Sequence, residues 1–155
     1  MINDISNKIL SVDSKESCDA VYREMSQSSK NVDFPGIAVV LSDKSRVMGV
    51  VTDGDFRRAY SDDYDFQMSI DSIMNPTPLI ITEMDLESHN FSSYTKWLDR
   101  NSKLPSVCLV TCNENKLIGA IHTSVISKMI NSKGFVTSIY GLGFVGLTLA
   151  THLSS

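Results

Sequence analysis

The sequence has no excess of positive charge and no long apolar run. Its 155 residues include 14 Lys and Arg against 18 Asp and Glu, which gives a net charge of -4 at pH 7. Binding to nucleic acid or to a membrane surface needs a face rich in Lys and Arg, so this balance argues against both partners. No segment reaches the roughly 20 apolar residues that span a bilayer, and no basic run followed by an apolar stretch marks a secretory signal. We therefore expect a cytoplasmic protein.

Cysteine is scarce, and catalytic motifs are missing. Cys18, Cys108 and Cys112 have no metal-ligand spacing, and their mostly apolar surroundings predict reduced core residues. Neither His89 nor His152 has a carboxylate or cysteine at ligand spacing, so we predict no metal site. No Ser, Cys or Lys nucleophile lies in a recognisable motif. The sequence therefore predicts a binding protein and not an enzyme.

What the sequence does contain is an internal repeat. Pro35 and Gly49 recur as Pro105 and Gly119 at an offset of 70 residues, without a gap between them, and the flanking residues match in type. A unit of this size buries little apolar surface alone, so we expect the two copies to complete one core by packing their sheets together. Clefts between the copies are then the expected location of function.

The first copy has the pattern strand, helix, strand, strand, helix. Branched apolar runs joined by a tight turn predict two antiparallel strands, and helical spacing precedes and follows them. The Asp13 and Glu16 pair is typical of a helix start. The expected elements are a leading strand at 9–11, a helix at 14–28, strands at 37–41 and 47–51, and a helix at 53–60.

The second copy repeats this order, which predicts an α+β fold of two tandem β-α-β-β-α repeats related by a pseudo-twofold axis. An aromatic stripe on its first helix, which includes Tyr94 and Trp97, is interpreted as core packing. The expected elements are a strand at 79–82, a helix at 86–100, strands at 106–111 and 116–121, and a helix at 124–131. The predicted domains are a first repeat at 1–68, a linker at 69–78, a second repeat at 79–133 and a C-terminal piece at 134–155.

Polar chemistry gathers where the last strand of the first copy ends. Thr52 and Asp55 bracket the start of a helix, so a hydroxyl, a carboxylate and free backbone N–H groups face one space. A carboxylate can accept hydrogen bonds from two neighbouring hydroxyls, as it does when an acidic residue holds a ribose. Arg57 and Arg58 lie one turn further and could contact phosphate. On spacing alone, the favoured interpretation is a simple helix cap with solvated arginines.

The doubled unit, with Gly49-Val50-Val51-Thr52-Asp53-Gly54-Asp55 at its strand-to-helix junction, resembles a cystathionine-beta-synthase (CBS) domain pair, the Bateman module. The resemblance covers residues 8 to 132. It implies a regulatory module that binds an adenine nucleotide (AMP, ADP or ATP) in the cleft between the repeats. By the family pattern Thr52 and Asp55 would hold the ribose, Ile37 and the chain at 9–11 would flank the base, and Arg57 or Arg58 would meet phosphate. A homodimer is expected on the same resemblance.

The second copy departs from this pattern at the site. At the offset of 70 residues Thr52 becomes His122 and Asp55 becomes Val125, so the carboxylate that would hold a ribose is absent. We therefore expect one of the two pockets to be weak or empty.

The C-terminal segment has a different motif. A predicted strand at 135–140 leads into Gly141, Gly143 and Gly146, in the Gly-x-Gly-x-x-Gly spacing that lets a backbone approach a pyrophosphate. With the residues that follow, it resembles the opening of the UDP-glucose/GDP-mannose dehydrogenase family. One strand and one helix cannot form a sheet, so this chain is not expected to bind NAD, whereas a full-length parent would. We expect an artificially shortened fragment of such a protein, or a separate short product of its gene.

Three functions follow as hypotheses. The first is a nucleotide-sensing module that modulates an attached nucleotide-sugar dehydrogenase. The second is a dimerisation module whose clefts are empty. The third is the N-terminal fragment of a dehydrogenase whose catalytic part is missing from this chain.

Overall fold

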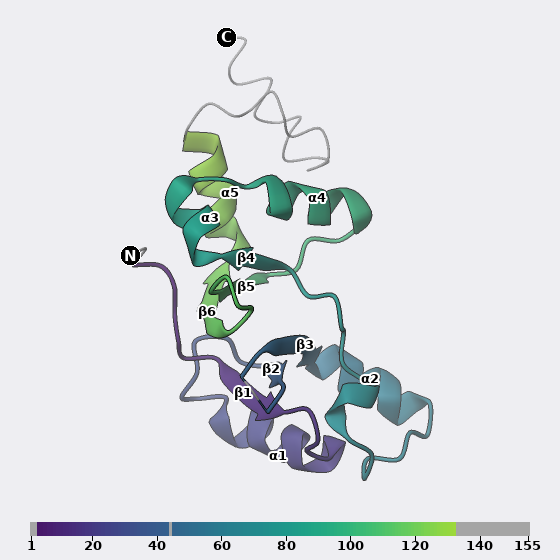
Figure 1. Cartoon of the computed structure of the whole chain (residues 1–155). Coiled ribbons are helices and arrows are strands. Elements are labelled where there is room, and N and C mark those ends of the chain that lie inside the picture. Colours follow the sequence, from purple (N-terminus) through teal and green to yellow (C-terminus); the bar gives the residue numbers. More distant parts are fainter. Residues whose placement is uncertain (1–2, 44, 133–155) are drawn as a thin grey trace.

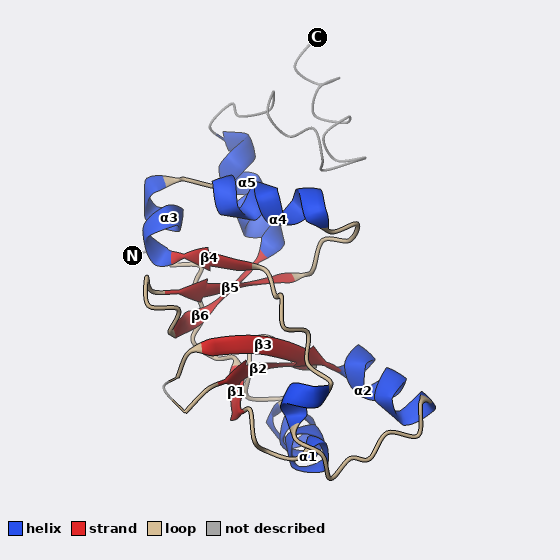
Figure 2. Cartoon of the chain, turned by 45° about the vertical axis from the view of Figure 1, so that its right-hand side comes forward, coloured by secondary structure: helices blue, strands red, loops and turns tan. Residues whose placement is uncertain are grey.

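A computed structural model describes residues 3–43 and 45–132 of the chain. Two three-stranded sheets face each other, and helices cover the outer face of each sheet (Figures 1 and 2). This arrangement confirms the predicted α+β fold of two tandem repeats. The C-terminal piece at 134–155 lies outside the described residues.

The first repeat forms the sheet β1-β2-β3. β1 runs parallel to β2, because α1 connects them, while β3 returns antiparallel through a short turn. Its elements are β1 (Leu10–Asp13), α1 (Cys18–Ser28), β2 (Ile37–Leu41), β3 (Val47–Thr52) and α2 (Asp53–Ser61).

The second repeat forms the sheet β4-β5-β6 with the same strand directions. The β5-β6 register repeats that of β2-β3 at the offset of 70, whereas β4 is shifted by one residue. The linker between the repeats contains one short 3-10 helix, η1 (Ile70–Ser72). The other elements are β4 (Ile80–Thr82), α3 (Glu83–Ser88), α4 (Ser92–Arg100), β5 (Val107–Thr111), β6 (Leu117–His122) and α5 (Thr123–Ser132).

The central strands β2 and β5 are almost entirely apolar because both of their faces are buried. Val40 and Val51 point into the core between the first sheet and its helices, where Ile70 also packs. Val39 instead packs with Leu109 in the layer between the two sheets. One shared apolar layer therefore joins the repeats, as the repeat pattern predicted.

The repeated glycines lie where another backbone crosses the sheet edge. The N–H of Val50 donates to the carbonyl of Asn75 at 3.0 Å, and a Cβ on Gly49 would lie 2.5 Å from that oxygen. In the second repeat Ser6 crosses β6 in the same way, and its carbonyl leaves no room for a Cβ on Gly119. Close backbone approach therefore explains why both positions are glycine.

The single helix predicted at 86–100 is wrong, because the chain forms α3 and α4 instead. His89 adopts a left-handed conformation with φ 56°, and its N–H bonds back to the carbonyls of the last helical turn. Asn90 then fixes the break, since its side chain donates to Asp85 and accepts from the N–H of Ser92. The apolar spacing continues across the break, so periodicity alone did not reveal it.

The first helix also begins later than predicted. The Asp13 N–H donates to Glu16 at 2.9 Å, as a capping pair would, but α1 starts at Cys18 with Ser17 as its cap. The first residues of the predicted helix therefore form a turn.

Candidate functional site

The end of β3 and the start of α2 are joined by a capping box. Thr52 ends the strand in an extended conformation and is the N-cap of the helix. The Oδ2 atom of Asp55 accepts hydrogen bonds from the Thr52 backbone N–H at 2.7 Å and from its hydroxyl at 2.6 Å. An acid in the first turn also complements the helix dipole. The structure thus brings together the two residues expected at a ribose.

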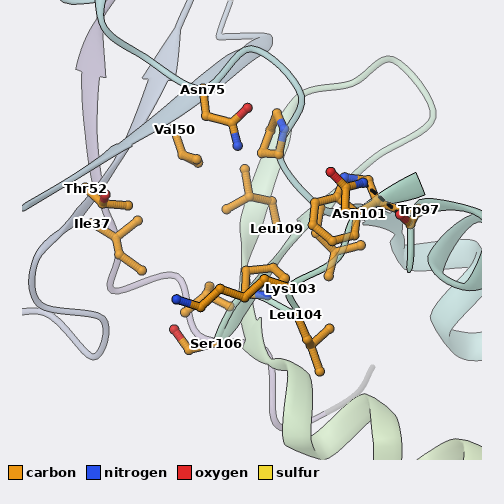
Figure 3. Close-up of a pocket in the computed structure, with 14 residues that line it drawn as sticks. Ile37, Val50, Thr52, Asn75, Trp97, Asn101, Lys103, Leu104, Ser106 and Leu109 are labelled. Atoms are coloured by element: carbon orange, nitrogen blue, oxygen red, sulfur yellow. Dashed lines mark hydrogen bonds between the residues drawn. The ribbon is translucent and has the colours of Figure 1, made fainter. Parts of the chain in front are cut away.

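Ile37, at the start of β2, lies directly across the sheet from Thr52. Both residues line the same pocket, which has a volume of about 580 Å³ and opens between the two repeats (Figure 3). Its walls are mostly apolar: Ile37, Val50 and Thr52 from the first repeat, and Leu79, Val107 and Leu109 from the second.

The two arginines lie elsewhere. The Arg58 guanidinium is bonded to Oδ1 of Asp55, and its own side chain is 72% exposed. Arg57 lines a separate groove on the outer side of the first repeat. Neither residue lines the pocket between the repeats.

The sequence analysis missed Trp97 as a pocket residue. The aromatic stripe of α4 is largely core, because Tyr94 is fully buried and Leu98 nearly so. Trp97, however, is only partly buried, lines the pocket, and donates its indole N–H to the Thr77 carbonyl at 3.2 Å. The sequence signal was a difference between the repeats, because the residue 70 positions before Trp97 is the polar Gln27.

The segment expected to flank a base also differs. Ile9, in the leading segment of the first repeat, is buried in the layer between the sheets. Strand pairing makes Pro78 and Leu79 the equivalents of Ile9 and Leu10, and both of these second-repeat residues line the pocket. The leading segment of the second repeat, and not that of the first, therefore contributes to the pocket wall, and Lys103, just before β5, contributes as well.

A second, symmetry-related cleft would lie beside His122, the equivalent of Thr52. There the aromatic ring of Phe34 packs against the His122 ring, with their centroids 4.9 Å apart. Phe34 is 4% exposed, whereas the equivalent residue beside the open pocket, Leu104, is 39% exposed. The first repeat thus fills with its own side chain the space that the second repeat leaves open.

The outer groove of the first repeat lies between α1 and α2 and has a volume of about 1060 Å³. Phe56 forms its floor, and its ring packs against that of Tyr22 at a centroid distance of 5.2 Å. Tyr22 and Tyr60 border the groove with exposed rings, at 48% and 78% of their surface. This groove is a surface where aromatic rings and Arg57 meet solvent.

Within residues 3–43 and 45–132, no group of three or more His, Cys, Asp or Glu side chains could hold a metal ion. In the same part of the chain, every helix is too short or too polar to cross a bilayer. Gly141, Gly143 and Gly146 lie outside the described residues, as does His152.

Comparison with known proteins agrees with this fold. Residues 2–62 match the CBS domain family. No curated protein matches the chain in sequence.

Among solved structures, similarity is clear in fold but low in sequence. The cytosolic domain of the Mg²⁺ channel MgtE, in complex with ATP, aligns with a TM-score of 0.59 and 16% identity over 81% of this chain and 46% of that one. A CBS domain protein from Pyrobaculum aerophilum complexed with AMP aligns with a TM-score of 0.57 and 15% identity over 83% of this chain and 95% of the other.

A CBS domain pair in complex with 5′-methylthioadenosine and S-adenosyl-L-methionine aligns with a TM-score of 0.55 and 16% identity, over 84% of this chain and 94% of that chain. The chain therefore spans less than half of the MgtE chain but nearly all of the other two. The shared architecture is that of a CBS domain pair.

Proposed function

We propose that this chain is a regulatory CBS domain pair that binds an adenine nucleotide of the AMP, ADP or ATP class in the pocket between its repeats. The observation that carries the proposal is that Thr52 lines a mostly apolar pocket while its hydroxyl is bonded to Asp55, which does not itself line the pocket. Three proteins of the same fold were solved with AMP, with ATP, or with adenosine derivatives.

The pocket chemistry suits a nucleoside. Apolar side chains such as Val107 and Leu109 would cover the faces of a base, and Trp97 offers a ring edge or face beside them. The Thr52 hydroxyl would meet the ribose, and the Asp55 carboxylate lies one hydrogen bond behind it.

To contact a ribose hydroxyl, Asp55 must exchange one of its hydrogen bonds within the protein for a hydrogen bond to the ligand. Its Oδ1 atom is bonded to Arg58, whose side chain is 72% exposed. An ion pair with an exposed partner contributes little to stability, so Arg58 can leave at small cost and free that oxygen for a ribose hydroxyl. Arg58→Ala is therefore expected to keep or improve nucleotide affinity.

Calorimetric titration of AMP and ATP into the full chain tests the proposal. We expect saturable binding that Asp55→Ala weakens by at least about tenfold, the effect of a lost hydrogen bond to a charged group. Glu24→Ala removes one acidic charge from the exposed face of α1 and is the matched control, with unchanged affinity. Equal affinity in wild type and Asp55→Ala would refute the site.

We also propose that the chain forms a homodimer, through the outer groove of the first repeat. The exposed rings of Tyr22 and Tyr60 beside this groove favour burial against a second copy. Sedimentation at micromolar concentration should show a dimer that Tyr60→Ser weakens. A monomer for the wild-type chain would contradict this.

Modulation of an attached nucleotide-sugar dehydrogenase is the third part of the proposal. It is supported only by the sequence motif at Gly141, Gly143 and Gly146. A longer chain that continues past residue 155 should oxidise a nucleotide sugar with NAD, at a rate that changes when AMP or ATP is added. A rate that is unaffected by adenine nucleotides would refute the proposed modulation of the dehydrogenase.

A further inference from the structure

The pocket between the repeats is lined by one charged side chain among the described residues, and that residue is Lys103. No carboxylate in the described part of the chain forms a salt bridge with it, whereas Lys15, Arg58 and Lys116 each have an acidic partner. Figure 3 shows the Lys103 side chain extended along the pocket toward Ser106 and Ile37. An unpaired ammonium group at the edge of an apolar pocket is a ready partner for an anion.

Repeat symmetry shows that this charge is specific to the open pocket. The residue equivalent to Lys103 in the first repeat is Asp33, which lies next to Phe34 on the side of the filled cleft. The Asp33 carboxylate accepts a hydrogen bond from the Ser6 hydroxyl. The backbone N–H of Asp33 donates to the Lys8 carbonyl. The open cleft therefore has a lysine at the position where the filled cleft has an aspartate, and that aspartate is hydrogen-bonded within the protein.

We infer that Lys103 binds the anionic group of the ligand, and that the pocket is built for a nucleotide with one phosphate and not for a triphosphate. This inference rests on the proposed function and names its ligand more narrowly. Arg57 and Arg58, the cations expected from the sequence, do not line the pocket. A single lysine can pair with one phosphate, and no second cation that the structure describes lines the pocket to pair with the further phosphates of a triphosphate.

The test compares adenosine, AMP and ATP, titrated by calorimetry without divalent cations into the full chain. In wild type, AMP should bind about tenfold or more tightly than adenosine, as expected for a hydrogen bond to a charged group, and at least as tightly as ATP. Lys103→Ala should reduce the affinity for AMP to that for adenosine and leave adenosine binding unchanged. Lys103→Arg keeps the charge and should keep most of the preference for AMP.

The matched control is Lys96→Ala, which removes the same charge from the exposed side of α4, away from the pocket lining. It should leave the ratio of AMP to adenosine affinity unchanged, so that a general effect of net charge is separated from direct contact. Thermal melting of each variant shows that the chain is folded.

The outcomes separate the two proposals. If Lys103→Ala binds AMP as wild type does while Asp55→Ala does not, the role of Lys103 is overturned and the nucleotide site stands. If ATP binds ten times more tightly than AMP, the preference for one phosphate is overturned. If wild type binds none of the three compounds, the proposed function itself fails, and this inference fails with it.

Discussion

The ring of Phe34 lies with its centroid 4.9 Å from the ring of His122, and the two planes are inclined at 50°. This contact joins the two repeats at the place where symmetry would put a second ligand pocket. Phe34 is also part of the apolar layer between the sheets, together with Ala120 and Leu109. The same side chain thus closes one cleft and contributes to the core.

Replacing Phe34 should therefore destabilise the fold. Phe34→Ala removes a ring that is 4% exposed, and such truncations typically cost about 3–5 kcal/mol of unfolding free energy. Leu104→Ala, at the equivalent and 39% exposed position, should cost less than about 1 kcal/mol. Urea denaturation measures both. Similar losses in the two variants would show that Phe34 does not support the interface.

Because the Phe34 ring fills the second cleft, calorimetric titration of wild type is expected to show one nucleotide bound per chain.

The two repeated glycines give a prediction about backbone packing. A Cβ at Gly49 would lie 2.5 Å from the Asn75 carbonyl oxygen, and a Cβ at Gly119 would clash with the Ser6 carbonyl. Gly49→Ala and Gly119→Ala should each lower stability by about 1–3 kcal/mol, because backbone must move.

The control for these variants is Gly54→Ala, in the first turn of α2. Its Cβ would lie 3.5 Å from the Thr52 hydroxyl, an ordinary contact, and alanine is the better helix former. Urea denaturation should show a gain of up to about 1 kcal/mol. A loss at Gly54 as large as that at Gly49 would mean that space is not the cause.

Most of the fold could be predicted because the repeat carries local signals. The runs at Ile37–Leu41 and Val47–Thr52 are short, branched and joined by a tight turn, so strand type and direction followed directly. The break at His89 was missed because the apolar spacing continues through it, and it depends on Asn90 bonding to residues on both sides.

The candidate site was harder to predict than the fold. Thr52 and Ile37 line the pocket as cross-strand neighbours, which strand pairing makes foreseeable. Trp97 and Lys103 come from the other repeat, and their place depends on how the two sheets pack together. A single sequence shows that Lys103 and Asp33 differ in charge at equivalent positions, but it does not show which cleft is open.

Burial of Cys108 predicts a loss of stability at alkaline pH. Burial in the core of the second repeat raises the pKa of the Cys108 thiol far above its ordinary value of 9.0. The unfolded chain then releases this proton above about pH 9 while the folded chain retains it, so the unfolding free energy falls as pH rises. Burial also raises the pKa of Tyr94, which acts in the same direction above pH 10.

Cys108→Ala should flatten this dependence between pH 8.5 and 10. The measurement is urea denaturation at a series of pH values, and the slope against pH is compared because the absolute stability also changes with side-chain volume. Val110→Ala, in the same core cluster, serves as control because it removes buried volume without removing a titrating group, and it should leave the slope as in wild type. An unchanged slope in Cys108→Ala would rule out this thiol as the source.

Asn115 connects the two repeats through the turn between β5 and β6. Its carbonyl accepts from the Val47 N–H and its side-chain amide donates to the Val47 carbonyl, both at 3.0 Å. Its backbone is left-handed, with φ 62°. Asn115→Ala should cost about 1–2 kcal/mol, since it loses one hydrogen bond and places a residue with a Cβ in a region that asparagine tolerates better.

Asn115→Gly separates these two contributions, because glycine also loses the bond but accepts the left-handed backbone without strain. It should therefore unfold at higher urea than Asn115→Ala. Ser45, at the equivalent position of the first repeat, has φ 61°, so Ser45→Gly should gain about 0.5–1 kcal/mol. Equal losses for the alanine and glycine variants at 115 would assign the whole effect to the hydrogen bond with Val47.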